Sequence, residues 1–111
     1  MKYLCLVYPR EGFGPTSQNA RDFIELRSTM TDAGVFLGAG QLRPVSSSTT
    51  VRVRDGETLL TDGPFAEIKE HVGGFVLLEC SDLDEAVKWT AMLPGIEGGG
   101  AEIRPLVDYP M

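Results

Sequence analysis

The segment "GGFVLLECSDLDEAVKW", residues 73–89, joins an unbroken apolar run to a helix start and decides the fold class. Residues 73–80 carry one charge among apolar and aromatic side chains, which is typical of a buried β-strand. Ser81 and Asp84 have the spacing of a capping box and predict a helix that runs to about Leu93. The apolar spacing predicts an inward helix face made of Leu83, Ala86, Val87 and Leu93.

The same pairing of strand and helix opens the chain. Residues 2–8, "KYLCLVY", predict a strand, and a helix is expected over about 17–33, capped by Thr16 or Ser17 and ended by Gly34. The predicted inward face of this helix consists of Ala20, Phe23, Ile24, Met30 and Ala33.

Two further strands are predicted with interruptions. In residues 35–44, Gly38 and Gly40 indicate that another backbone or a ligand approaches closely. In residues 101–107, Pro105 removes a hydrogen-bond donor and indicates an edge strand.

Residues 50–60 predict a β-hairpin. Valines at 51 and 53 alternate with arginines at 52 and 54, and Asp55-Gly56 favours a type I′ turn because both residues tolerate positive φ. With this hairpin taken as an insertion, the order of elements is βαββαβ, the ferredoxin-like plan. We therefore predict one α+β domain over residues 1–111, with an antiparallel sheet and two helices on one face.

The central strands of this plan are apolar on both faces. Tyr3, Cys5 and Val7 alternate with Leu4, Leu6 and Tyr8, and residues 75–78 repeat the pattern. Two helices cover only one face, and each large side chain left in water costs about 1.5–3 kcal/mol relative to burial. We therefore expect a homodimer packed sheet to sheet, with a cavity between the sheets or at their ends.

The charge balance excludes some partners. A formal charge of -6 with scattered basic residues disfavours nucleic acid and anionic membranes. The opening has neither a signal peptide pattern nor a membrane span, so we expect a cytoplasmic protein. Cys5 and Cys80 lie in apolar runs and are interpreted as buried, reduced thiols, with a disulfide or metal site as the alternative. No cofactor is expected, since "GIEGGG" (95–100) follows a helix and lacks the residues of a phosphate-binding loop.

The chain resembles the YCII-related family, in the branch called DGPF-domain proteins. The resemblance covers almost the whole chain and rests on "MKYLCLVY", "AGVFLGAGQLRP", "TTVRVRDGETLLTDGPFAEIKE", "GGFVLLEC", "DLDEAVKW" and "EIRPL". It implies a ferredoxin-like fold of the dimeric α/β-barrel group. The family's role is mostly unassigned, although some members are encoded beside sigma factors and one wider member is a dehydrochlorinase.

The sequence departs from the family's short YCII branch, which is thought to use a His-Asp pair. The first predicted helix contains no histidine, and "MLPGIEGG" stands where that branch has an Asp-Pro motif. No catalytic pair is therefore transferred to named residues. Within the DGPF stretch, Ile68 and His71 replace a commoner threonine and glutamine.

The candidate site residues gather around "TDGPFAEIKEH" (61–71). Asp62, Gly63 and Pro64 favour a rigid turn from which Phe65 enters the core; alternatively, the Asp62 carboxylate lies at the mouth of the cavity as base or hydrogen-bond acceptor. His71, the chain's one histidine, is either a surface residue or a proton carrier paired with Asp62 or Glu67.

Three residues of the strands complete this set. Tyr8 and Arg104 are candidate ligand-binding residues together with Phe65 and Glu67. Glu79 and Arg104 interrupt apolar strands, and they are predicted either to form an ion pair or to be exposed at an edge.

The favoured hypothesis is a small-molecule-binding homodimer with its pocket near the DGPF turn. One alternative is a cofactor-independent lyase or isomerase acting on a small metabolite, aromatic ones included, with Asp62 and His71 transferring protons. The other is a regulatory module that works with a transcription factor.

Overall fold

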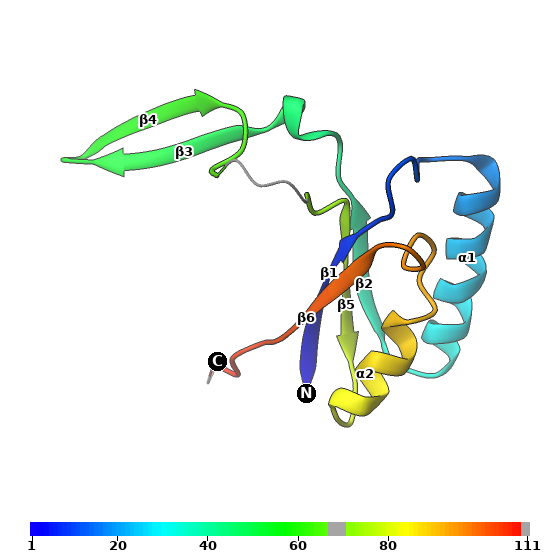
Figure 1. The fold of residues 1–111 in the computed structure, drawn as a ribbon. Coiled ribbons are helices and arrows are strands. Elements are labelled where there is room, and N and C mark those ends of the chain that lie inside the picture. The colour runs from blue at the N-terminus through cyan, green and yellow to red at the C-terminus, as the bar shows by residue number, and fades with distance from the viewer. Residues whose placement is uncertain (67–70, 110–111) are drawn as a thin grey trace.

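The computed structural model describes residues 1–66 and 71–109 and contains one four-stranded sheet, one separate hairpin and two α-helices (Figure 1). The antiparallel sheet has the order β2–β5–β1–β6. Its strands are β1 (Lys2–Tyr8), β2 (Phe36–Gln41), β5 (Gly74–Glu79) and β6 (Gly100–Pro105). This order confirms the predicted ferredoxin-like plan, with the first and third major strands at the centre and β6 at an edge.

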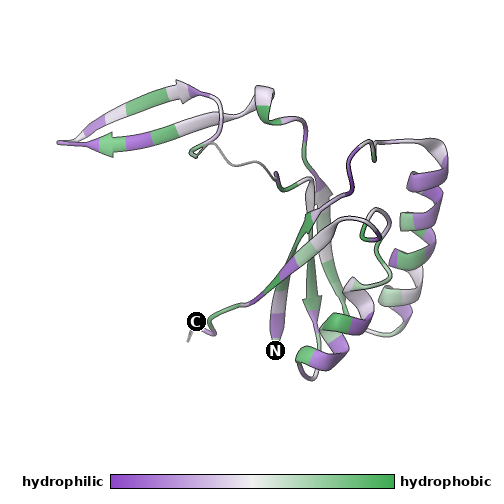
Figure 2. Cartoon of the chain, viewed as in Figure 1, coloured by the Kyte–Doolittle hydropathy of each residue, from purple (hydrophilic) through white to green (hydrophobic). Residues whose placement is uncertain are grey.

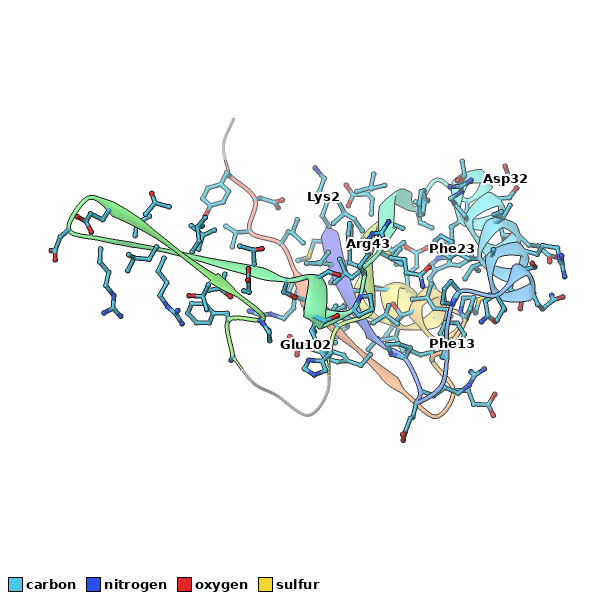
Figure 3. The ribbon with its side chains drawn as sticks, turned by 90° about the horizontal axis from the view of Figure 1, so that it is seen from above. Lys2, Phe13, Phe23, Asp32, Arg43 and Glu102 are labelled. Atoms are coloured by element: carbon cyan, nitrogen blue, oxygen red, sulfur yellow. The ribbon has the colours of Figure 1, made fainter. Side chains whose placement is uncertain are left out.

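Helices α1 (Ser17–Asp32) and α2 (Leu83–Thr90) lie on the same face of the sheet (Figure 1). The core lies between them and the sheet, where Cys5, Met30, Val76 and Leu78 are buried. Figure 3 shows Phe23 between α1 and the sheet, and this side chain packs against the core.

The inward helix faces differ in part from the predicted ones. Of the predicted residues, Met30, Ala86 and Leu93 are buried, whereas Ala20, Ile24, Ala33, Leu83 and Val87 are exposed. On α1 the buried stripe runs through Leu26 and Met30, and on α2 it runs through Ala86 and Thr90. The small side chains of Ala86 and Thr90 let α2 approach the sheet closely, so the larger Leu83 and Val87 point elsewhere.

Both helices begin at side-chain caps. The hydroxyl oxygen of Thr16 accepts a hydrogen bond from the backbone amide of Asn19, as predicted. The cap of α2 is Asp82, not Ser81: its carboxylate accepts the amide of Glu85, while Glu85 accepts the Ser81 amide at 2.8 Å. The prediction was therefore wrong by one residue, because the acid that closes this cap lies one position further along than Asp84.

The inserted hairpin consists of β3 (Thr49–Arg54) and β4 (Glu57–Asp62), and it does not join the main sheet. Asp55 and Gly56 have φ of 51° and 78°, which confirms the type I′ turn. The hairpin projects from the side of the sheet that faces away from the helices (Figures 1 and 3). We call residues 49–62 the arm.

The arm makes the single chain extended. The radius of gyration is 15.9 Å, whereas a compact chain of this length has a value of about 13 Å. A single copy therefore leaves an unusually large surface uncovered.

Both cysteines are free and buried. The Cys5 sulfur and the Thr90 hydroxyl share a hydrogen bond of 3.1 Å. Burial raises the pKa of the Cys5 thiol, and the bond to Thr90 partly opposes this shift. Burial, with the Glu85 carboxylate as a second cause, raises the pKa of the Cys80 thiol to about 11. Two protonated thiols in the interior fit a structural role.

We expect Cys80 to be unreactive in the native protein. At pH 8, raising the thiol pKa from 9.0 to about 11 lowers the thiolate fraction about 100-fold. Iodoacetamide should therefore label Cys80 at least that much more slowly in native than in urea-unfolded protein, as measured by mass spectrometry. Because the native state keeps the proton that the unfolded state loses, the free energy of unfolding should fall as pH rises from about 9 to 11. Equal labelling rates in the two states would contradict this prediction.

No helix among the described residues is both long enough and apolar enough to cross a membrane.

Candidate functional site

The face of the sheet opposite the helices carries apolar side chains with no helix over them. By strand register, Leu4 and Leu6 of β1 share this face with Phe75 and Leu77 of β5. All four side chains are partly exposed, unlike Cys5, Val76 and Leu78 on the helix side. The prediction that both faces of the central strands are apolar is confirmed. Figure 2 shows hydrophobic residues on these strands. We call this surface the open face.

Glycines in β2 shape one side of the open face. Gly38 and Gly40 pair with Leu77 and Phe75. A Cβ atom on Gly40 would lie 2.8 Å from Cε1 of Phe75, so the phenyl ring occupies the space that a side chain would fill. The close approach at Gly40 is therefore made by the Phe75 ring, not by the backbone or ligand that the sequence predicted. At Gly38 the prediction was wrong, because an added Cβ meets nothing within 4 Å.

Charged groups border the open face on β6. Arg104 pairs with Leu4 and Glu102 with Leu6 in the register, which places both on this face. Arg104 Nη1 lies 3.2 Å from Glu102 Oε2 and donates a hydrogen bond to it. The predicted alternative of an ion pair between Glu79 and Arg104 was wrong.

Glu79 has a different partner at the end of β5. Its Oε2 atom lies 2.8 Å from the amino group of Met1, which also donates a hydrogen bond to the carbonyl of Cys80. The hydrogen bond to the Glu79 carboxylate raises the pKa of the Met1 amino group, against opposing desolvation. The charge of Glu79 is thus matched at the strand end and does not point to a ligand.

Tyr8 lies at the other end of the open face from Arg104. It pairs with Gly100, four positions before Arg104 on β6, so the two residues are separated by about 13 Å along the strands. A compact ligand in one subunit therefore reaches both only if it lies along β1.

The DGPF turn is attached to the arm. Asp62 ends β4, and the amide of Gly63 donates to the carbonyl of Ser48 at 2.8 Å. The hydroxyl of Thr50 donates to the carbonyl of Gly63 at 2.7 Å. These two bonds hold the turn against the base of β3, as expected for a rigid corner.

Phe65 does not enter the core. Its side chain is 72% exposed, and the guanidinium carbon of Arg52 lies 4.8 Å from its ring centroid. This distance is typical of a cation–π contact. The expectation that Phe65 plugs the core was wrong, because the turn folds along the arm and the arm lies away from the core.

The remaining predicted residues are Glu67 and His71. Glu67 lies outside the described residues. His71 is exposed, two residues before Gly73, whose amide donates to the carbonyl of Val7 at 2.8 Å. This bond places the His71 segment at the end of β1 that carries Tyr8. Within the described part of the chain, no hydrogen bond joins His71 to Asp62, and both side chains are exposed.

Two recesses among the described residues lie elsewhere. One of about 300 Å³ is lined by Arg10, Phe13 and Asp22 among others. The other, of about 680 Å³, runs between α1 and α2 and includes Lys88 and Trp89. Neither contains a predicted site residue. Across residues 1–66 and 71–109, no group of three or more His, Cys, Asp or Glu residues is placed to hold a metal ion.

Two residues that contact predicted site residues are not indicated by the sequence patterns above. Glu102 is the partner of Arg104, and Arg52 is the partner of Phe65. Residues 102 and 104 are two positions apart, so they lie on one face of a strand. This spacing could have predicted their ion pair. The contact of Arg52 with Phe65 depends on how the turn folds back, which no local pattern specifies.

Comparison with known proteins gives a consistent result. The YCII-related domain family matches residues 1–110. An uncharacterized protein of Rhizobium meliloti (strain 1021) is 37% identical over 91 residues, which cover 80% of this chain and 73% of that protein.

Proposed function

The chain belongs to the YCII-related family, and on that premise we propose that it forms a homodimer that binds a small molecule between two facing sheets. The observation that carries this proposal is the open face: Leu4, Leu6, Phe75 and Leu77 form one apolar surface on the two central strands. The two α-helices lie on the other side (Figure 1).

Packing against a second open face supports the dimer. Burying a fully exposed large apolar side chain contributes about 1.5–3 kcal/mol. The four side chains of the open face are only partly exposed in the single chain, so each contributes a part of that value, and together they favour association. Face-to-face sheets pack at about 10 Å. Charged and small residues around the apolar centre leave room for a ligand at the ends of the sheets.

The residues around the open face suggest the chemistry of the ligand. Leu6, Phe75 and Leu77 offer an apolar wall for a flat or aliphatic body. At one end, Tyr8 supplies a hydroxyl group and the nearby His71 a proton carrier; at the other end, Arg104 and Glu102 offer polar contacts. We propose a compact, largely apolar metabolite with one polar group.

Two measurements test this proposal. Sedimentation velocity at micromolar concentration should give a dimer, and native mass spectrometry of purified protein, followed by denaturation, should detect a co-purified small molecule. If none is retained, thermal unfolding with a panel of aromatic acids, phenols and alcohols should raise the melting temperature for some members, since a ligand stabilises by mass action. Phe75→Ala should abolish that rise, and Val87→Ala on the helix side should leave it intact. A stable monomer would refute the dimer, and a dimer unaffected by any probe and lacking bound ligand would refute the binding role.

A further inference from the structure

The arm has two chemically different faces. Cross-strand partners share a face, so Val51 and Val53 lie on the same side as Leu60. We call these three residues the valine face. Thr50, Arg52 and Leu59 lie on the opposite side, which we call the arginine face.

The chain covers the polar side of the arm and leaves the apolar side bare. Phe65 stacks on Arg52, and Thr50 is buried beneath the DGPF turn. On the valine face, Val51, Val53 and Leu60 are 57%, 67% and 68% exposed. In an antiparallel sheet with one packed and one solvated face, the apolar side is packed and the polar side is solvated. In the single chain, the arm has the reverse arrangement.

An isolated two-stranded hairpin is at best marginally stable, so the arm requires packing on the valine face. The arm also leaves the sheet on the side of the open face (Figures 1 and 3). A molecule that covers the open face therefore lies next to the arm. The open face and the valine face are both uncovered, and one partner molecule can cover both of them.

The area of the open face points to the same partner. Four strands of about six residues present a surface of roughly 20 by 20 Å. That is about half of the roughly 800 Å² that a standard interface covers on each partner. A second copy brings its own arm, so two arms add to the contact in an isologous dimer.

We propose that the arm of each subunit reaches across the dimer and packs its valine face on the partner subunit. This proposal rests on the homodimer proposed above. Because Gly63 and Phe65 are fixed to the arm by the contacts to Ser48, Thr50 and Arg52, the DGPF turn moves with it. Asp62 pairs with Thr49 and therefore lies on the valine face. The Asp62 carboxylate of one subunit thus borders the cavity lined by the partner's open face, and the ligand site is incomplete in a single chain.

Two adjacent leucines give a matched test. Leu60→Lys places a charge on the valine face, and Leu59→Lys places the same charge on the arginine face. Leu60→Lys should raise the dimer dissociation constant about tenfold or more, as measured by sedimentation equilibrium, whereas Leu59→Lys should change it less than about threefold. Equal effects of the two variants would overturn the assignment of the valine face.

Hydrogen exchange separates this inference from the dimer itself. In wild-type protein, amides of residues 51–60 should exchange at least about tenfold more slowly at a concentration where the dimer dominates than in dilute monomer. Protection of β1 and β5 on association with no change in the arm would overturn the arm contact while leaving the sheet-to-sheet dimer standing. A protein that stays monomeric throughout would refute both.

Discussion

Replacing Leu77 by aspartate should yield a folded protein that no longer dimerises. Leu77 lies in the centre of the open face and is partly exposed in the single chain, so the charge remains hydrated in the monomer. In the dimer the same carboxylate would be buried without a partner. Together with the loss of the apolar burial that Leu77 gains in the dimer, this unpaired buried charge should raise the dissociation constant at least about 100-fold. Sedimentation velocity and far-UV circular dichroism report association and fold separately.

Two controls define this result. Val87→Asp, at an exposed position of α2 on the opposite side, should leave the dimer intact. Leu78→Asp, at a residue that is 1% exposed and faces the helices, should prevent folding altogether. If Leu77→Asp sediments as the wild type does, the open face is not the interface.

The second large effect is expected at Gly99, where the chain passes close to the end of β1. A Cβ atom there would collide with the carbonyl oxygen of Tyr8 and would lie 2.6 Å from the amide nitrogen of Arg10. Both obstacles are backbone atoms and cannot rotate away. Gly99→Ala should therefore lower the free energy of unfolding by about 3 kcal/mol and the melting temperature by about 10 °C or more.

Gly100 supplies the matched control for this substitution. An added Cβ at Gly100 meets nothing within 4 Å, and the residue has no positive φ. Gly100→Ala should change stability by less than about 0.5 kcal/mol, as measured by thermal unfolding at the same protein concentration. Similar losses for both variants would show that flexibility of this loop, not the close contact of Gly99, is what the protein needs.

The sequence predicted the fold well because its strongest signals are local. The apolar run of residues 74–79, the Asp55-Gly56 turn and the cap at Thr16 each have one favoured backbone structure. The ferredoxin-like order then follows from the order of elements. The apolar alternation in β1 also predicted an open face correctly, because period 2 assigns every residue of a strand to one side.

Which helix side turns inward was harder to predict. In α2, Leu83 and Val87 form an apolar stripe, and Ala86 and Thr90 form a smaller one beside it. Hydrophobicity predicts that the first stripe packs on the sheet. In the structure the second stripe packs there, and Thr90 shares a hydrogen bond with Cys5. Close approach and one buried hydrogen bond decided the orientation, and both depend on a strand about 80 residues away.

The candidate site was predicted only in part for a similar reason. The turn chemistry of Asp62 and Gly63 is local and was recognised, but the direction of the turn is not. Phe65 lies on the arm because two hydrogen bonds fold the turn toward β3 and bring the ring over Arg52. The contact between Phe65 and Arg52 depends on how the turn folds back in three dimensions, so no periodic pattern in the sequence predicts it.

The strand order has a consequence for synthesis on the ribosome. Strand β1 has no partner until β5 and β6 emerge, since Cys5 pairs with Val76 on one side and Ile103 on the other. At about 5–20 residues per second, the first of these partners is made roughly 4–14 s after β1. During that interval the apolar strand β1 is exposed in the nascent chain with both of its edges unpaired. Chaperones that act on emerging polypeptides therefore have a defined target here, and the sheet is completed only when β6 has left the exit tunnel.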